Sequence, residues 1–81
     1  MKLEILTPQQ NVYSGDVKLV KVPGSNGSFE VLKNHAAIIS TLVPGQLKIE
    51  TEEGETIHYK TTGGVIEAKD NNIIILLESI E

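Results

Sequence analysis

A glycine-rich turn and the histidine that follows it are the residues best suited to chemistry in this sequence. The turn reads Gly24-Ser25-Asn26-Gly27-Ser28, and His35 lies shortly after it. Glycine-rich loops can cradle phosphate, but the P-loop pattern needs a lysine after its last glycine and a helix behind it. Here Ser28 follows Gly27, and the alternation of apolar residues after it is typical of a strand. The sequence therefore argues against a phosphate-binding loop.

The titratable residues form no catalytic or metal-binding pattern. Ser28, His35 and Asp16 supply the residue types of a catalytic triad, but nothing in their spacing supports one. His35 and His58 are far apart in the chain, and the sequence contains no cysteine, so the three or four converging ligands of a zinc site are missing. The sequence predicts a non-catalytic domain, with no metal and no cofactor, that works through its surface.

Length and charge narrow the class of partner. The chain has 81 residues, a net charge of -4 and a pI of about 5.1, so we expect one domain covering residues 1–81. Its basic residues are scattered lysines without a single arginine, which argues against nucleic acid because phosphates demand clustered basic side chains. No apolar run reaches the roughly 20 residues of a membrane-spanning helix. We also expect no signal peptide at the N-terminus.

Apolar residues alternate with polar ones in short runs that turn residues separate, and no run keeps the period of a long helix. Such spacing is typical of an all-β domain, here a two-sheet β-sandwich of about eight to ten short strands. Residues 13–16 and 70–72 are expected to be turns. The strands are predicted at residues 2–6, 17–22, 29–32, 38–43, 47–52, 57–61, 65–69 and 73–77.

Three strands depart from simple alternation. In the second, Val17 and Leu19 share one face and Val20 and Val22 the other, so either both faces are covered or a β-bulge shifts the phase. Gly63-Gly64 indicates a kink or a close backbone approach. Residues 73–77 are all apolar, which predicts cover on both faces, either by another subunit or by a loop of this chain. The predicted core contains Leu3, Ile5, Val31, Leu47, Ile49, Val65 and Ile75.

Four blocks of the sequence resemble the epsilon subunit of F-type ATP synthases. The longest, Pro23–Ala36, matches Pro-Gly-x-x-Gly-x-Phe-x-Val-Leu-x-x-His-Ala. Tyr13-Ser14-Gly15 precedes it, and Leu42-Val43-Pro44-Gly45 and Gly63-Gly64-Val65-Ile66-Glu67 follow it in the family's order. The resemblance covers essentially the whole chain and implies a ten-stranded sandwich.

The resemblance implies a place on the rotor of a proton-translocating ATP synthase. The chain would be a non-catalytic central-stalk subunit that couples the gamma subunit to the membrane c-ring during ATP synthesis. It would lie on the cytoplasmic face of the bacterial inner membrane as a peripheral part of the complex. Carried over by position, the c-ring contact falls on Ser28, Glu30, Lys33, Asn34 and His35, and the gamma contact on Thr7, Thr41 and Leu42.

This sequence departs from the family pattern around His35. Many relatives have an acid where Ser28 stands, Pro-Gly where Lys33-Asn34 stands, and proline where Ala37 stands. The resemblance therefore supports the binding role but not the detailed c-ring contacts, and His35 is interpreted equally as a residue that holds the loop in shape. Relatives continue into a C-terminal helical hairpin that inhibits ATP hydrolysis and in some binds ATP, and these roles are not carried over to residues 1–81. The alternative function is a free-standing β-sandwich adaptor that binds a peptide or protein by strand addition at an exposed edge.

Overall fold

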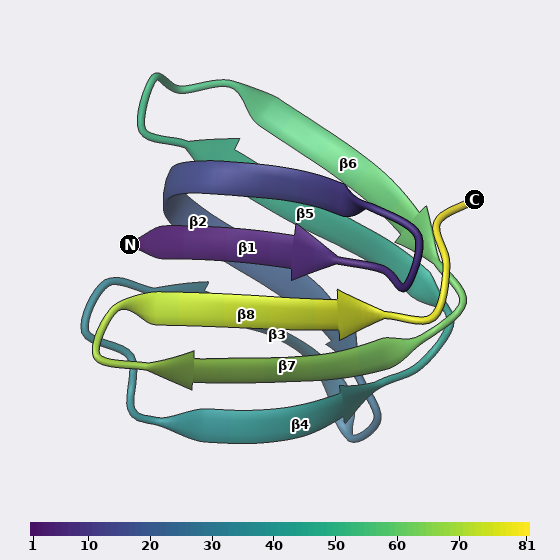
Figure 1. The fold of residues 1–81 in the computed structure, drawn as a ribbon. Helices are drawn as coiled ribbons and strands as arrows, with labels where there is room; N and C mark the ends of the chain where they lie inside the picture. The colour runs from purple at the N-terminus through teal and green to yellow at the C-terminus, as the bar shows by residue number, and fades with distance from the viewer.

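The computed structural model describes residues 1–81 as eight β-strands with no helix (Figure 1). This confirms the predicted all-β class and the predicted eight to ten strands, but not the ten strands that the family resemblance implies. The turn expected at residues 70–72 forms at Asp70 and Asn71, which both take the left-handed conformation, with φ of 51° and 62°, and Asn72 already belongs to the next strand. The strands are β1 (Lys2–Leu6), β2 (Asn11–Gly24), β3 (Gly27–Leu32), β4 (Ile38–Leu42), β5 (Gly45–Thr51), β6 (Thr56–Thr61), β7 (Gly64–Lys69) and β8 (Asn72–Leu77).

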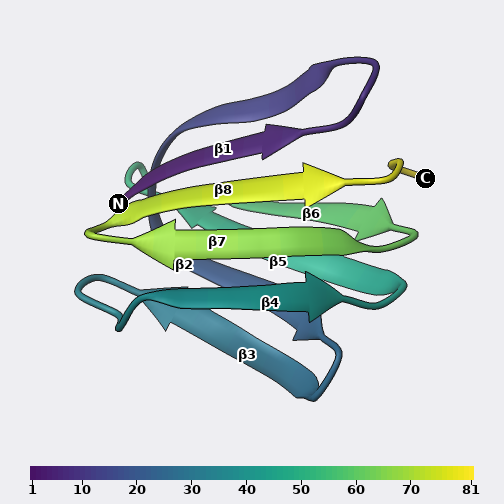
Figure 2. The ribbon, with the colours of Figure 1, turned by 60° about the horizontal axis from the view of Figure 1, so that its bottom comes forward.

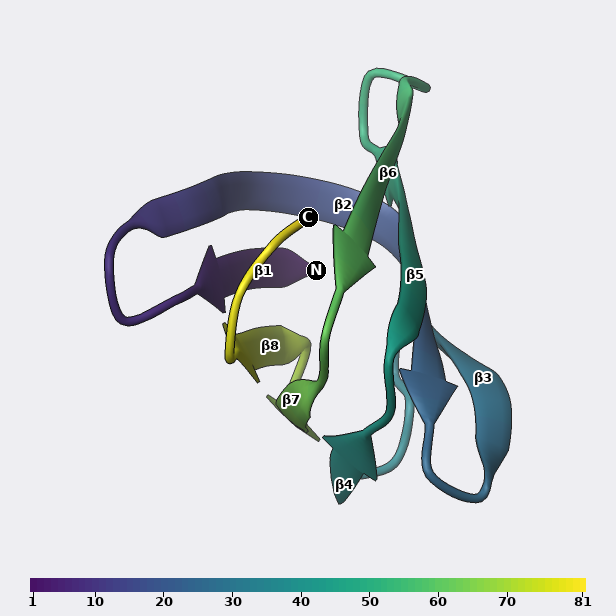
Figure 3. The same ribbon diagram turned by 90° about the vertical axis from the view of Figure 1, so that its right-hand side faces the viewer.

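The strands stack in two layers, which confirms the predicted sandwich. Hydrogen bonds connect them in the order β1-β8-β7-β4-β2-β5-β6, with β3 beside β2 and a further pairing of β1 with β2. β2 pairs with β1 along its first half and with β3 and β5 along its second half, so it passes from one layer to the other. Figure 3 shows β1, β8, β7 and β4 facing β3, β5 and β6 across the core.

The turn expected at residues 13–16 is wrong, because these residues continue β2. Tyr13 lies opposite Ile5 and Gly15 opposite Leu3 in an antiparallel pair. A Cβ atom on Gly15 would lie 3.0 Å from the Tyr13 hydroxyl oxygen. The tyrosine ring therefore covers the glycine backbone, a packing that lets a strand contain glycine without bending.

The mixed phase of β2 comes from a β-bulge, the second of the two alternatives. Val17 pairs with Thr51 and Leu19 with Glu50, so the register of β2 against β5 shifts between them. Lys18 is exposed at the shift, while Val17 and Val20 are both buried. The extra residue turns the strand at the point where it changes layers.

Fourteen buried hydrophobic side chains form one core between the layers. Six of the seven predicted core residues belong to it, but Val65 does not, because it is 38% exposed and its neighbour Ile66 is fully buried. Val65 shares its face of β7 with Glu67 and Lys69, and the two charges need water. The core comprises Leu3, Ile5, Val17, Val20, Val22, Val31, Leu42, Leu47, Ile49, Ile66, Ala68, Ile73, Ile75 and Leu77.

Gly63 and Gly64 make the predicted close backbone approach. Gly63 has φ of 132°, and its carbonyl oxygen accepts a hydrogen bond from the Glu78 N–H at 3.0 Å. A Cβ atom on Gly64 would overlap the Leu76 carbonyl oxygen. Only glycine lets β7 start at this distance from β8.

β8 is covered on one face only. Ile73, Ile75 and Leu77 point into the core, while Ile74 and Leu76 are 40% and 52% exposed. The expectation that a loop of this chain covers the outer face is therefore wrong. Cover by another subunit stays a prediction.

Truncating a side chain on the buried face of this layer should lower the free energy of unfolding more than truncating one on the exposed face. Ile66→Ala should lower the free energy of unfolding by about 2–5 kcal/mol, because it opens a cavity in the core. Ile74→Ala should cost under about 1 kcal/mol, because its side chain already meets water. Urea unfolding measures both, and similar losses would contradict the assignment of the two faces.

Candidate functional site

The residue types of a catalytic triad do not come together. Ser28 pairs with Pro23 at the start of β3, whereas His35 follows the end of that strand. Asp16 pairs with Lys2 in the other layer. No group of three or more histidine, cysteine, aspartate or glutamate side chains is placed to hold a metal ion.

The glycine-rich turn is a hairpin tip that joins β2 to β3. Gly24 pairs with Gly27, and Ser25 and Asn26 form the two-residue turn between them. Gly27 has φ of 119°. Ser25 ties the tip to β4, because its N–H donates to the Thr41 carbonyl oxygen at 3.0 Å and its hydroxyl accepts from the Thr41 hydroxyl at 2.9 Å. The turn fixes the hairpin against the opposite layer.

The five residues predicted to contact a c-ring are all exposed and follow one another along one edge of the molecule. We call them the β3 strip: Ser28, Glu30, Lys33, Asn34 and His35. Ser28 and Glu30 project from β3, which pairs only with β2, and the other three lie in the loop before β4. Ser28 is at the end of β3 near Thr41, and His35 is at the opposite end. The strip therefore spans the length of the strand.

The loop part of the β3 strip is fastened to the turn between β7 and β8. The Asn34 N–H donates to Asn71 Oδ1 at 2.7 Å, and Asn71 Nδ2 donates to Asn34 Oδ1 at 3.1 Å. Asn34 has φ of 66° and Asn71 has φ of 62°, a conformation that asparagine tolerates better than most residues. This Asn34–Asn71 clasp was not foreseen, because its partners are far apart in the sequence.

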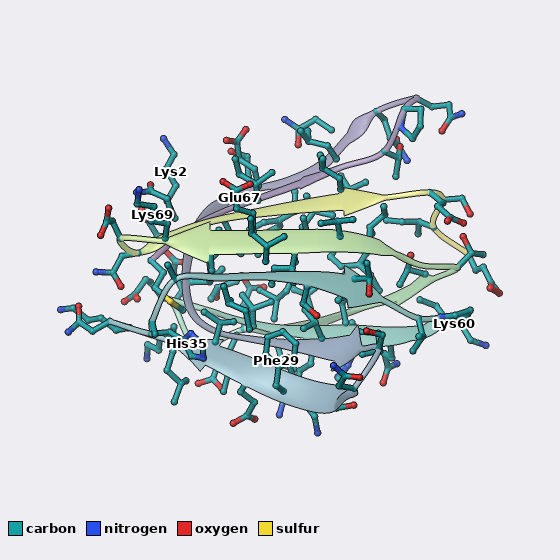
Figure 4. All side chains as sticks on the ribbon, turned by 90° about the horizontal axis from the view of Figure 1, so that it is seen from below. Lys2, Phe29, His35, Lys60, Glu67 and Lys69 are labelled. Atoms are coloured by element: carbon teal, nitrogen blue, oxygen red, sulfur yellow. The ribbon has the colours of Figure 1, made fainter.

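His35 helps to shape the same loop. Its N–H donates to the Leu32 carbonyl oxygen at 3.0 Å. Its ring nitrogen Nδ1 lies 2.7 Å from the Ala36 carbonyl oxygen, so that nitrogen carries the proton and donates. The side chain is exposed, and no hydrogen bond occupies Nε2. Figure 4 shows His35 at one end of the molecule and Lys60 at the other.

Two of the residues predicted to contact gamma lie at one end of the β1–β8–β7–β4 layer. β1 runs parallel to β8, and β4 and β8 both run antiparallel to β7, so β1 and β4 finish at the same end of the layer (Figure 2). Thr7 follows β1 and Thr41 lies near the end of β4. Leu42 is only 6% exposed, because its side chain belongs to the core. Leu42 could therefore contact a gamma subunit only through its backbone, or act indirectly by supporting its neighbours from within the core.

An exposed apolar surface extends from Thr41 across the same layer. Ile39 is 73% exposed, and with Val65, Ile74 and Leu76 it forms what we call the β4–β7–β8 surface. Strand register places these residues on one face of the layer. Val65 lies between Thr41 and Leu76, whereas the charged Glu67 lies between Ile39 and Ile74 and divides the apolar area there.

The end of the β4–β7–β8 surface near Thr41 is slightly hollowed, with Pro8, Val65 and Leu76 among its lining residues. Lys2 and Lys69 stand together at the opposite end of the layer, and Glu67 lies nearer the middle (Figure 4). The sequence names no residue of this surface as a gamma contact, although it predicts that another subunit or a loop covers residues 73–77. Its only signal was the unbroken apolar run at residues 73–77.

Tyr13 lies in the first half of β2, where its side chain is partly buried. Burial raises the pKa of its phenol above 10.0, and the negative charge of Glu53 raises it further. The phenol therefore stays neutral at pH 7. It is a packing residue over Gly15 rather than an acid or a base.

The structure contains no helix that is long and apolar enough to cross a membrane. Comparison with known families places all of residues 1–81 in the β-sandwich domain of the ATP synthase delta/epsilon chain.

One curated relative is the ATP synthase epsilon chain of Protochlamydia amoebophila, which is 42% identical over 98% of this chain. The chain spans only 54% of that relative's length.

Solved structures show the same fold. A chain in the structure of the Euglena gracilis mitochondrial ATP synthase, a complex of OSCP, F1 and the c-ring, superposes with a TM-score of 0.88 at 22% identity, over 98% of this chain and 51% of the other. A chain in the structure of the central stalk and c-ring of the Tetrahymena thermophila mitochondrial ATP synthase gives a TM-score of 0.81 at 21% identity, over 100% of this chain and 65% of the other.

The Asn34–Asn71 clasp predicts a local effect of one substitution. Asn71→Gly keeps the left-handed turn but removes the acceptor of the Asn34 N–H, so this amide should exchange its hydrogen faster by about fivefold to tenfold, as expected for one lost hydrogen bond. Asp70→Gly is the matched control, because Asp70 is left-handed too and its side chain makes no bond to the loop. Equal exchange in both variants would show that the clasp does not hold the loop.

Proposed function

Because the chain belongs to the β-sandwich domain family of the ATP synthase delta and epsilon chains, we propose that it is a rotor subunit of the central stalk that couples the gamma subunit to the c-ring. The observation that carries the proposal is the family match over all of residues 1–81. The domain is a non-catalytic part of the ATP synthase. Its place would be on the cytoplasmic face of the bacterial inner membrane.

The gamma subunit would bind the β4–β7–β8 surface. Contiguous exposed apolar side chains are typical of protein interfaces, whose centres are apolar and whose rims are polar. Ile39, Ile74 and Leu76 would form the centre, and the threonines Thr7 and Thr41 would form the rim. Leu42 would support the contact from below, through its place in the core.

The c-ring would bind the β3 strip, which belongs to a different edge of the sandwich. Glu30 supplies a negative charge for a basic c-ring loop, a rim ion pair worth about 0–1 kcal/mol and weakened by salt. Lys33, Asn34 and His35 supply hydrogen-bonding groups on a loop that the Asn34–Asn71 clasp holds in place.

Coupling needs a stiff body between the two contacts. The β3 strip and the β4–β7–β8 surface are joined through β2, which pairs with β3 directly and with β4 through Gly24 and Leu42. A close-packed core resists deformation. Torque applied at one surface would therefore reach the other without a hinge inside the domain.

A charge placed in the apolar surface should break the gamma contact. In calorimetric titration with a purified rotor gamma subunit, we expect a one-to-one complex that Leu76→Glu weakens by about a hundredfold or more, because it buries an unpaired carboxylate at the interface. Thr56→Glu, on the opposite layer, should leave the affinity unchanged. An unaltered affinity of Leu76→Glu, or no complex with the unmodified chain, would refute the gamma assignment.

Reversing one charge in the β3 strip should weaken coupling to the membrane sector. We expect Glu30→Lys to lower ATP-driven proton pumping of the reassembled complex, most clearly at low salt, while the domain stays folded, because Glu30 is exposed. Glu55→Lys, the same charge change in the exposed β5–β6 turn, is the control. Unchanged pumping in Glu30→Lys would count against the c-ring contact at this position.

A further inference from the structure

β6 is an open edge of the sandwich. It closes the sheet order at one end and pairs only with β5. Figure 1 shows it outermost, with the C-terminus beside its last residues. An open edge presents unpaired backbone N–H and C=O groups, which can pair with another extended chain.

The last residues of the chain already begin such a pairing. Ile80 forms an antiparallel bridge with Thr61, and the Glu81 N–H donates to the Lys60 carbonyl oxygen at 2.9 Å. Ile80 packs against the core, whereas Glu81 is exposed opposite Lys60. The edge thus accepts an apolar residue that points inward and an acid that points outward.

The pairing also shows which backbone groups of β6 remain open. The Lys60 carbonyl points away from β5, because Glu81 binds it. Backbone groups alternate in direction along a strand. The N–H and C=O groups of His58 and Thr56 therefore also point outward, and they continue the line that Ile80 and Glu81 begin.

The side chains of β6 also favour a partner strand with apolar residues on its inner face and acids on its outer face. Ile57 and Tyr59 are partly buried and pack against the core, so an apolar side chain beside them would complete its cover. His58 and Lys60 point to solvent on the other face.

Basic residues extend this outer face over two further strands. His58 lies opposite Lys48, and Lys48 lies opposite Lys21. Like charges on facing strand positions destabilise a sheet, and here they gather on a chain whose net charge is -4. Glu30 and Glu50 stand at the margins of this basic row, opposite Lys21 and two residues beyond Lys48. An acidic partner would relieve the repulsion.

We propose that the open edge of β6 binds an extended segment of a partner protein in which apolar and acidic residues alternate. The segment pairs antiparallel with Thr56–Tyr59 and continues the line of Ile80 and Glu81. Its apolar side chains cover Ile57 and Tyr59. One of its acids lies directly opposite His58, and Lys48 lies one strand further in on the same face. Backbone hydrogen bonds give the affinity and the alternation gives the selectivity. A second copy of this chain fits less well, because pairing β6 with itself would set basic side chains against one another.

The test is an NMR titration of the isotope-labelled chain with a short capped peptide of alternating valine and glutamate. We expect shifts of the amide signals of β6 and of Ile80 and Glu81, and slower hydrogen exchange of the His58 and Thr56 amides. A peptide of alternating valine and lysine is the control for charge. The β4–β7–β8 surface should give no shifts, so the outcome is independent of gamma binding.

Two variants separate the contributions of charge and backbone. Lys48→Glu should weaken binding of the glutamate peptide by about twofold to threefold, because Lys48 is about two strand spacings from the peptide, close to the Debye length at 0.1 M salt. Lys69→Glu, the same change on β7, should have no effect. His58→Pro should abolish binding, because it removes an outward N–H without breaking the ladder to β5.

Four results would overturn the proposal. They are equal binding of the valine–lysine peptide, shifts confined to another surface, no shifts up to the solubility limit of the peptide, and shifts of the β6 amides that depend on protein concentration without peptide. The last result would identify a second copy of this chain as the occupant.

Discussion

The whole sandwich depends on the path of β2 between the layers. Its first half is bonded to β1 and its second half to β3 and β5, so one strand supplies hydrogen bonds to both sheets. The bulge at Lys18 makes this possible, because it rotates the chain so that Val17 and Val20 both enter the core. Without this path of β2 the two layers would be held together by side-chain packing, by the contacts of Gly24 and Ser25 with β4, and by the bridge between Thr61 and Ile80.

Because β2 crosses between the layers, the domain has two outer faces, and each can suit a different partner. Residues on the outer faces of the two layers differ in character: the β4–β7–β8 surface is apolar, whereas the face that carries Lys21 and Lys48 is basic. A domain without a catalytic cluster can still act in several directions if each face suits a different kind of partner. The arrangement is that of a connector, in which shape and rigidity replace an active site.

The sequence was sufficient for the class of fold because alternation and turn residues are local signals. Sequence prediction was wrong where the same residue type fits two different structural environments. A glycine predicts a turn at residues 13–16, but the ring of Tyr13 covers Gly15 within a strand. Alternation predicts Val65 in the core, but Glu67 and Lys69 on the same face of β7 require water.

The candidate contact residues come from the family resemblance, and they stay predictions. Other features are visible only in the three-dimensional structure and could not be predicted from the sequence. The Asn34–Asn71 clasp, the basic row and the open edge of β6 each join residues that are distant in sequence. Nothing in local propensity or in short spacing reports such pairings.

The parallel pairing of β1 with β8 bears on how the domain is made. Leu3 lies opposite Ile73 and Ile5 opposite Ile75, so the first strand to leave the ribosome needs the last one beside it. Until β8 emerges, the apolar face of β1 can be covered only through its pairing with β2. Contacts between such distant segments slow folding, since the intervening chain must be ordered first. The domain should therefore reach its native state only after synthesis of β8, and a nascent chain that stops earlier would expose the strands that form the centre of the core.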